Sequence, residues 1–294
     1  MSSAKKEALS VQFLISMLTR EKTESAALAG YIKAHVENMK LSAESILIHQ
    51  CDRNAYEELS CNGHKVRCYH FAERGVGLSR NNALMRADAD ISVFADEDIV
   101  YEKDAAEQIR QAFMQHPEAD MLLFNVKVAK ERRTYWNDSF HRVRWYNCGR
   151  YPAYSFALRT GKMHAANVSY SLLFGGGARF SNGEDSLFIS DCLKAGLKVY
   201  AVPVCIGEEI PRPSTWFFGY NEKFFYDRGV LYHYLYKKMA PVWGLRFMLK
   251  MKSALAVQNV TAQDGVMPDG KTALTWKMAW SLMLDGIRDA RKGI

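Results

Sequence analysis

The segment ISVFADEDIV, residues 91–100, places three acidic residues directly after a short apolar run. Ile91, Val93 and Phe94, bounded by turn-forming residues, predict a buried strand, which puts Asp96 at its carboxyl end. In open α/β sheets, ligands bind at that edge. Carboxylates packed this closely repel one another unless a cation or several donors offset them, and hard divalent metals take such oxygen ligands. The pattern therefore indicates either a metal site or a solvated turn.

Strand-like runs alternate with helical patterns through the first half of the chain. The runs are VQFLISML (11–18), SILIHQ (45–50), VRCYHF (66–71), ISVFA (91–95) and DMLLFNV (120–126), and the helical patterns include residues 24–39 and 103–116. This alternation favours β-α-β units and a largely parallel sheet. We therefore expect an α/β fold whose nucleotide-binding sheet is flanked by helices.

The composition suits an enzyme with one sizeable core. The chain has 294 residues, of which 48% are hydrophobic and 24% charged. It contains no run of eighteen apolar residues, so a transmembrane helix is not predicted. Six cysteines without a C-x-x-C pair or a histidine at zinc-site spacing predict reduced thiols in a cytoplasmic protein. The net charge of +7 favours polyanionic partners: nucleotides, nucleic acid or an anionic membrane face.

The second half is less regular. Residues 130–159 are rich in Arg and aromatic side chains, and they form either a cover over the core or a loop that faces a substrate. Glu184 and Asp185 open a predicted helix that Gly196 closes, and residues 197–203 predict one more strand. Asp185, near a helix N-terminus, is favoured in its ionised form.

From residue 222 onward the sequence predicts helices. The stretch LYHYLYKKMAPVWGLRFMLKMK (231–252) contains basic residues and no acid; the basic residues are Lys237, Lys238, Arg246, Lys250 and Lys252. This composition is typical of an interfacial helix, and a core-packed helix with a solvated basic face is the alternative. We expect a catalytic domain over 1–230 and a helical extension over 231–294.

Three motifs resemble family 2 glycosyltransferases. GVGLSRNNALMRADADISVFADED (75–98) resembles the stretch where an Arg-Asn helix start leads into a strand ending in D-x-D. FGGGARFSNGEDSLFISDCLKAGLKVYAVP (174–203) is similar to the later segment in which a Glu-Asp pair opens a helix before a final strand. STWFFGYNEKFFYDRG (214–229) resembles a signature of the bacterial branch that builds capsular or exopolysaccharide units. The resemblance covers about residues 10–230.

The resemblance implies a GT-A fold and an inverting hexosyltransferase that uses a nucleoside diphosphate sugar, in the first place a UDP-sugar. Asp96 and Asp98 would hold Mn²⁺ or Mg²⁺ and the donor. Asp185 would act as general base, and Glu184 and Trp216 would contact the acceptor. A metal clamp with a separate carboxylate base is also what transfer from a diphosphate leaving group requires chemically.

The donor in this family rests on the ends of the first two strands. Those ends carry Thr19 and Arg20, then Gln50 and Asp52. Arg80, at a predicted helix start, is either a diphosphate contact or a partner in a surface salt bridge. The chain departs from the family in three places. SMLTR stands where the family often has Pro-x-Tyr or Pro-x-Asn at the end of the first strand, and HQCDRN stands where it has the acid-rich pattern DDGSTD at the end of the second. Residues 203–232 contain no histidine to serve as a further metal ligand.

Three other functions are alternatives for this sequence. In a haloacid-dehalogenase-like phosphatase, Asp96 would be a phosphoryl-accepting nucleophile, but that family opens its fold with this strand. In a nucleic-acid-binding protein, the two acid clusters would repel the phosphates of the bound nucleic acid. An inactive partner subunit is the third alternative. We expect a polysaccharide biosynthesis enzyme that does not bind nucleic acid and lies peripherally on the inner membrane face, where its acceptor is a lipid-linked glycan.

Overall fold

The computed structural model describes residues 8–19, 25–130, 132–210, 219–260 and 274–293. The chain divides into two compact units. The first comprises Met1–Leu172 and Glu184–Pro213, and the second comprises Leu173–Gly183 and Ser214–Ile294. The expected domain boundary at residue 230 lies inside a helix, α6 (Glu222–Tyr236).

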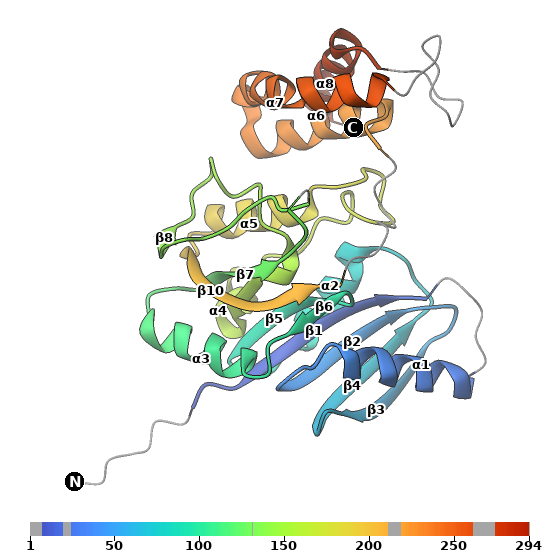
Figure 1. The fold of residues 1–294 in the computed structure, drawn as a ribbon, viewed down its shortest axis with the longest axis vertical. Coiled ribbons are helices and arrows are strands. Elements are labelled where there is room, and N and C mark those ends of the chain that lie inside the picture. The colour runs from blue at the N-terminus through green and yellow to red at the C-terminus, as the bar shows by residue number, and fades with distance from the viewer. Residues whose placement is uncertain (1–7, 20–24, 131, 211–218, 261–273, 294) are drawn as a thin grey trace. The chain divides into compact units, whose positions relative to one another are not determined.

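The first unit is built on a ten-stranded sheet in the order β3-β4-β2-β1-β5-β9-β7-β10-β6, with β8 paired to β10 (Figure 1). The strands are β1 (Val11–Leu18), β2 (Glu44–Gln50), β3 (Ala55–Cys61), β4 (His64–Phe71), β5 (Ile91–Asp96), β6 (Ile99–Tyr101), β7 (Met121–Lys127), β8 (His141–Arg142), β9 (Phe156–Arg159) and β10 (Val199–Glu209). Strands β4, β2, β1 and β5 are parallel, whereas β9 runs antiparallel to both β5 and β7. The carboxyl ends of the four parallel strands therefore lie at one edge of the sheet. Predicted site residues lie at the ends of β1, β2 and β5 on this edge.

Helices cover both faces of this sheet. They are α1 (Ser25–Asn38), α2 (Val76–Arg86), α3 (Ala105–Gln115), α4 (Thr160–Ala166) and α5 (Glu184–Lys194). Phe13 and Ile15 of β1 pack in one core with Ile109 of α3, while Leu14 between them packs in a second core with Phe188 of α5. Successive strand residues point to opposite faces, so a strand covered on both sides is a continuous apolar run. The expected α/β class is confirmed.

In the described part of the second unit the α-helices are α6, α7 (Ala240–Val260) and α8 (Trp276–Arg291). Phe225, Met248 and Met283 lie in its core. Helices α6 and α8 approach through two glycines: a Cβ on Gly229 would lie 2.1 Å from the carbonyl oxygen of Met283, and one on Gly286 would lie 2.2 Å from that of Tyr226. This backbone contact leaves no room for a side chain at either position.

The basic stretch 231–252 spans two helices rather than one. Helix α6 ends at Tyr236, Lys237 has a φ of 48°, and a 3₁₀ turn over Lys237–Met239 precedes α7. A positive φ at a lysine is incompatible with an α-helix and interrupts it. Among the described helices, none is both long and apolar enough to span a bilayer.

Candidate active site

A buried arginine joins the two predicted acid clusters. Arg80 lies on α2, Asp96 is the last residue of β5, and Asp185 is the second residue of α5. The guanidinium Nη2 donates to Asp96 Oδ1 over 2.9 Å, and Nη1 donates to Asp185 Oδ1 over 2.7 Å. Glu184 Oε1 lies 3.6 Å from Nη1. These four residues, here called the Arg80 cluster, combine three carboxylates with one guanidinium.

Burial and the neighbouring charges together set the pKa of Asp185. Burial raises the pKa of Asp185 to about 7, against the opposing effect of Arg80, and Glu184 and Asp96 act in the same direction as burial. For Arg80, burial lowers the pKa, but the ion pairs with Asp185 and Asp96 outweigh it, so the guanidinium remains charged. Asp185 is 21% exposed. Its carboxyl group therefore keeps its proton to a higher pH than an ordinary aspartate, and the sequence expectation that the helix N-terminus favours the ionised form is wrong, because burial outweighs the helix dipole.

The local fold holds Asp185 and Arg80 in place. The backbone N–H of Ala153 donates to Asp185 Oδ2 over 3.0 Å, so both carboxylate oxygens are fixed. The guanidinium carbon of Arg80 lies 5.3 Å from the centre of the Tyr170 ring, which stacks on Phe188. The buried Tyr170 hydroxyl has no hydrogen-bond partner among the described residues. Neither Ala153 nor Tyr170 was predicted from the sequence, because no local motif marks them.

The side chains of Asp96 and Asp98 lie in the same environment at the end of β5. Both carboxylates help to raise the pKa of the buried hydroxyls of Tyr101 and Tyr154, for which burial is the larger cause. The two acids therefore lie near the same two rings. Carboxylate oxygens are the donors that Mn²⁺ and Mg²⁺ prefer, so this pair fits the predicted ion. Glu209, whose side chain is buried, is paired with Arg132 at 2.8 Å.

The predicted donor residues lie at the ends of β1 and β2. Gln50 is buried, and its Oε1 accepts from the N–H of Gly75 over 2.7 Å at the entry to α2. Thr19 Oγ1 lies 2.8 Å from His49 Nε2, and Asp52 is exposed. Gln50 thus anchors the helix that carries Arg80. Arg20 and Trp216 lie outside the described residues.

Comparison with known proteins identifies a shared fold. Residues 40–172 match the family model described as Glycosyl transferase family 2, which covers less than half of the chain, and no curated protein matches the sequence. The structure is similar to S. aureus TarS in complex with UDP-GlcNAc, with a TM-score of 0.56 and 13% identity over 97% of this chain and 91% of that one. It is also similar to the mannosyltransferase PcManGT from Pyrobaculum calidifontis in complex with GDP-Man and Mn²⁺, with a TM-score of 0.51 and 11% identity over 97% and 88%.

These likenesses confirm the expected fold. A mixed α/β sheet with flanking helices matches the GT-A fold of the neighbours. The family match supports a family 2 glycosyltransferase and includes Arg80, Asp96 and Asp98, whereas Asp185 lies beyond it. The capsular or exopolysaccharide branch stays a prediction.

Proposed function

We propose that this chain is an inverting hexosyltransferase that moves a sugar from a nucleoside diphosphate donor to a hydroxyl of a glycan. The observation that carries the proposal is the Arg80 cluster, in which a carboxylate of pKa about 7 and the acid at the end of β5 are held by one guanidinium. The neighbours' complexes with UDP-GlcNAc and GDP-Man support a nucleotide-sugar donor, and we favour a UDP-sugar.

Each acid of the cluster has one role in this reaction. Asp185 takes the proton of the acceptor hydroxyl, and the oxygen of that hydroxyl forms a bond to the anomeric carbon of the donor sugar. The bond from that carbon to the diphosphate breaks in the same step, and a single displacement inverts the configuration. Asp96 and Asp98 would hold Mn²⁺ or Mg²⁺, which neutralises the charge of the departing diphosphate when bound. Arg80 keeps Asp96 and Asp185 at fixed positions, so orientation accounts for much of the rate gain.

The remaining site residues divide between donor and acceptor. Thr19, Gln50 and Asp52, at the ends of β1 and β2, contact the nucleoside, and Arg20 is assigned to the same group from its place in the sequence. Arg80 also contacts the diphosphate. On the acceptor side, Glu184 orients the sugar, and Trp216 is assigned to the acceptor from its place in the sequence alone.

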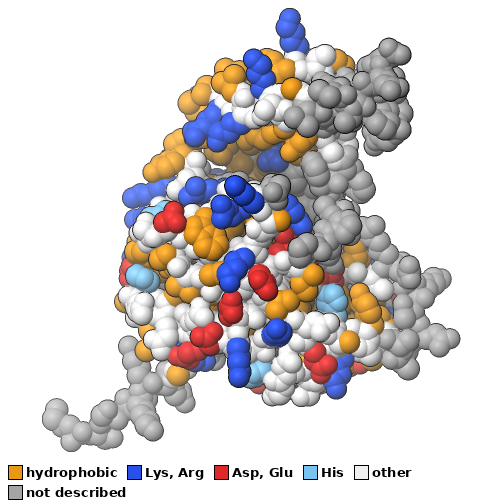
Figure 2. All heavy atoms as spheres, in the orientation of Figure 1, with side chains coloured by type: hydrophobic (Ala, Val, Ile, Leu, Met, Phe, Trp, Pro, Cys, Tyr) orange, Lys and Arg blue, Asp and Glu red, His pale blue; other side chains and the backbone are white. Residues whose placement is uncertain are grey.

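Helix α7 supports a membrane-bound acceptor. Val242, Leu245 and Leu249 recur at helical spacing and are 59%, 42% and 62% exposed. Exposed basic residues accompany them: Lys237, Lys238, Arg246, Lys250 and Lys252. Figure 2 shows hydrophobic and basic side chains together on the helical unit. Apolar side chains beside cations suit an anionic bilayer surface. A cytoplasmic enzyme bound to the inner membrane face would then extend a lipid-linked glycan in polysaccharide biosynthesis.

Liposome flotation tests the membrane contact. Replacing Lys237, Lys238, Lys250 and Lys252 by Gln should reduce flotation with anionic vesicles, because each basic residue near such a surface contributes about 1 kcal/mol. The matched control replaces four exposed lysines of the first unit: Lys40, Lys103, Lys130 and Lys162. Equal flotation of the two variants would remove this part of the proposal.

Nucleotide binding tests the central proposal. A thermal-shift screen with UDP-, GDP-, TDP- and CMP-sugars should show one donor class that stabilises the protein, and more strongly with Mn²⁺. With that donor, an Asp185→Asn variant should keep the thermal shift and lose sugar transfer. Hydrolysis of an aryl phosphate without any response to sugar nucleotides would instead favour the phosphatase alternative.

A further inference from the structure

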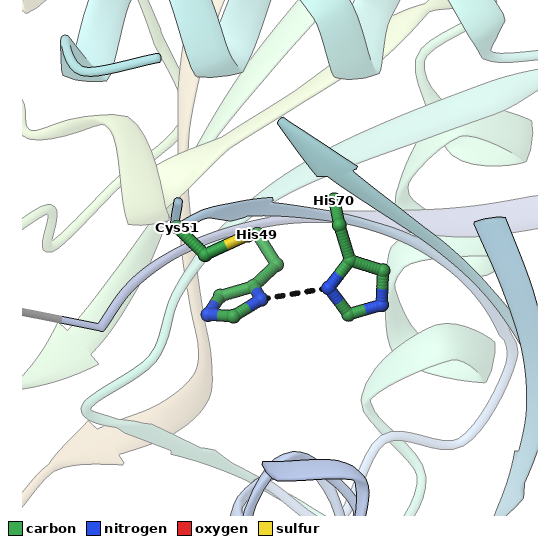
Figure 3. A group of neighbouring side chains, drawn as sticks. All are labelled: His49, Cys51 and His70. Atoms are coloured by element: carbon green, nitrogen blue, oxygen red, sulfur yellow. Dashed lines mark hydrogen bonds between the residues drawn. The ribbon is translucent and has the colours of Figure 1, made fainter. Parts of the chain in front are cut away.

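Two buried histidines and a cysteine meet on neighbouring strands, away from the Arg80 cluster. His49 on β2 is the register partner of His70 on β4, and Cys51 follows the end of β2. Their exposed fractions are 0%, 2% and 6%. The Nδ1 atoms of the two rings lie 2.9 Å apart. They face each other, as Figure 3 shows. One ligand atom from each of the three residues lies within 4.8 Å of the other two.

The outer nitrogen of each ring is held by an oxygen. His70 Nε2 lies 2.9 Å from Glu57 Oε1, and His49 Nε2 lies 2.8 Å from Thr19 Oγ1. Histidines that bind metals characteristically donate their second N–H to a carboxylate or another oxygen, which fixes the ring and its tautomer. Both rings therefore have their outer nitrogen fixed as in histidines that bind metals, and their Nδ1 atoms face each other.

We propose that His49, Cys51 and His70 form a zinc-type site, with two imidazole nitrogens and one thiolate as ligands. Zn–N bonds of about 2.0–2.1 Å and Zn–S bonds of about 2.3 Å give tetrahedral edges of roughly 3.3–3.7 Å. The two Nδ1 atoms would separate by about 0.4 Å from their present contact, and Sγ would close in through a rotation of the Cys51 side chain. A water molecule takes the fourth position.

The site differs in chemistry from the Asp96 and Asp98 pair. Nitrogen and sulfur ligands select Zn²⁺ and similar borderline-soft cations, whereas carboxylates alone select Mn²⁺ or Mg²⁺. A cation here would link the ends of β2 and β4 and fix the Thr19 hydroxyl through His49. It would therefore brace the edge where β1 and β2 end. The site does not depend on the proposed sugar transfer, because metal binding is measured without substrate.

Cobalt substitution tests the site directly. Untagged full-length protein, stripped with EDTA and titrated with Co²⁺, should bind one equivalent that produces a thiolate-to-cobalt band and is displaced by Zn²⁺. The Cys51→Ser variant should lose this band. The Cys205→Ser and Asp98→Asn variants should retain the band, because neither residue is one of the three proposed ligands. Glu57→Gln should keep the band but weaken affinity by about 10–100-fold, as a positioning residue.

Zinc X-ray absorption on the wild-type chain needs no variant and covers the case in which Cys51→Ser does not fold. The expected first shell contains one sulfur together with nitrogen or oxygen neighbours. A wild-type protein without the cobalt band, an equal band in Cys51→Ser and wild type, or a zinc shell without sulfur would each overturn the proposal. The His49–His70 contact would then be an ordinary hydrogen bond between neutral rings.

Discussion

Replacing Arg80 by Met tests the charge balance of the candidate active site. One buried guanidinium lies 2.7 Å from Asp185, 2.9 Å from Asp96 and 3.6 Å from Glu184. Two unit charges 4 Å apart interact by about 4 kcal/mol at an effective dielectric of about 20. Methionine keeps an unbranched apolar stem but leaves three carboxylates without their cation. Breaking a buried pair from one side costs about 3–5 kcal/mol. We expect that loss in the free energy of unfolding at pH 8.

The loss should be smaller in acid because Asp185 can take a proton. Its folded pKa of about 7 lies above the ordinary value of 3.8. The folded state therefore binds more protons than the unfolded chain between these values, and stability falls as the pH rises through this window. Without Arg80, which opposes the shift, the folded pKa rises further. If it reaches 8 or more, the difference between variant and wild type shrinks by about 1.0–1.4 kcal/mol from pH 8 to pH 5.

Hydrogen–deuterium exchange in urea, read from peptides of β1 and β5, measures this loss for the first unit alone. The matched control is Arg67→Met, which breaks a contact of 2.6 Å to Asp88, a side chain that is 65% exposed. A surface pair contributes at most about 1 kcal/mol. The reasoning is refuted if Arg80→Met is no more destabilising than Arg67→Met, or if it is more destabilising at pH 5 than at pH 8.

Three further predictions address the base, the metal pair and the helical unit. Asp185→Asn should lower sugar transfer by about 10²–10⁴-fold, and wild-type transfer should rise with pH through about 7; a rate that is flat from pH 5 to 8 would argue against this base. EDTA should abolish transfer, and Asp98→Asn should need at least about tenfold more Mn²⁺ for half-maximal rate, so an unchanged titration would exclude Asp98 as a ligand. In thermal unfolding, Gly229→Ala should destabilise the second unit by about 1–3 kcal/mol through a clash with Met283, whereas Gly161→Ala, with open space around its Cβ, should gain about 0.5 kcal/mol; equal effects would contradict the packing.

The core strands could be predicted from the sequence because burial on both faces produces a continuous apolar run. The predicted bounds of β1, β2, β5 and β7 agree with the structure to within one residue at each end. Strand β3 was missed, since its sequence AYEELSC is polar and largely exposed, as expected of an edge strand. Strand β9 was missed as well: it is four residues long and lies antiparallel between β5 and β7, an insertion that only tertiary pairing specifies.

The site was predictable only where a motif is local. Asp96 and Asp185 could be selected because each belongs to a short motif at a strand end or a helix start. Their joint contact with Arg80 could not be predicted, because Arg80 and Asp185 are 105 residues apart. The same limit applies to His49 and His70. Spacing rules for zinc sites describe ligands close in sequence, whereas these two meet through the parallel register of β2 and β4.

The position of Arg80 couples two proposals that the sequence left separate. Arg80 forms the salt bridge that was one of its two predicted roles, with Asp96 and Asp185, but this salt bridge is buried and does not lie at the surface. A diphosphate that contacts Arg80 therefore adds negative charge where three carboxylates already share one guanidinium. Such an arrangement is unfavourable unless another cation offsets it. A divalent ion at Asp96 and Asp98 would supply that charge. The proposed diphosphate contact of Arg80 therefore requires the proposed metal site at Asp96 and Asp98. Tight nucleotide binding that is indifferent to Mn²⁺ would contradict both.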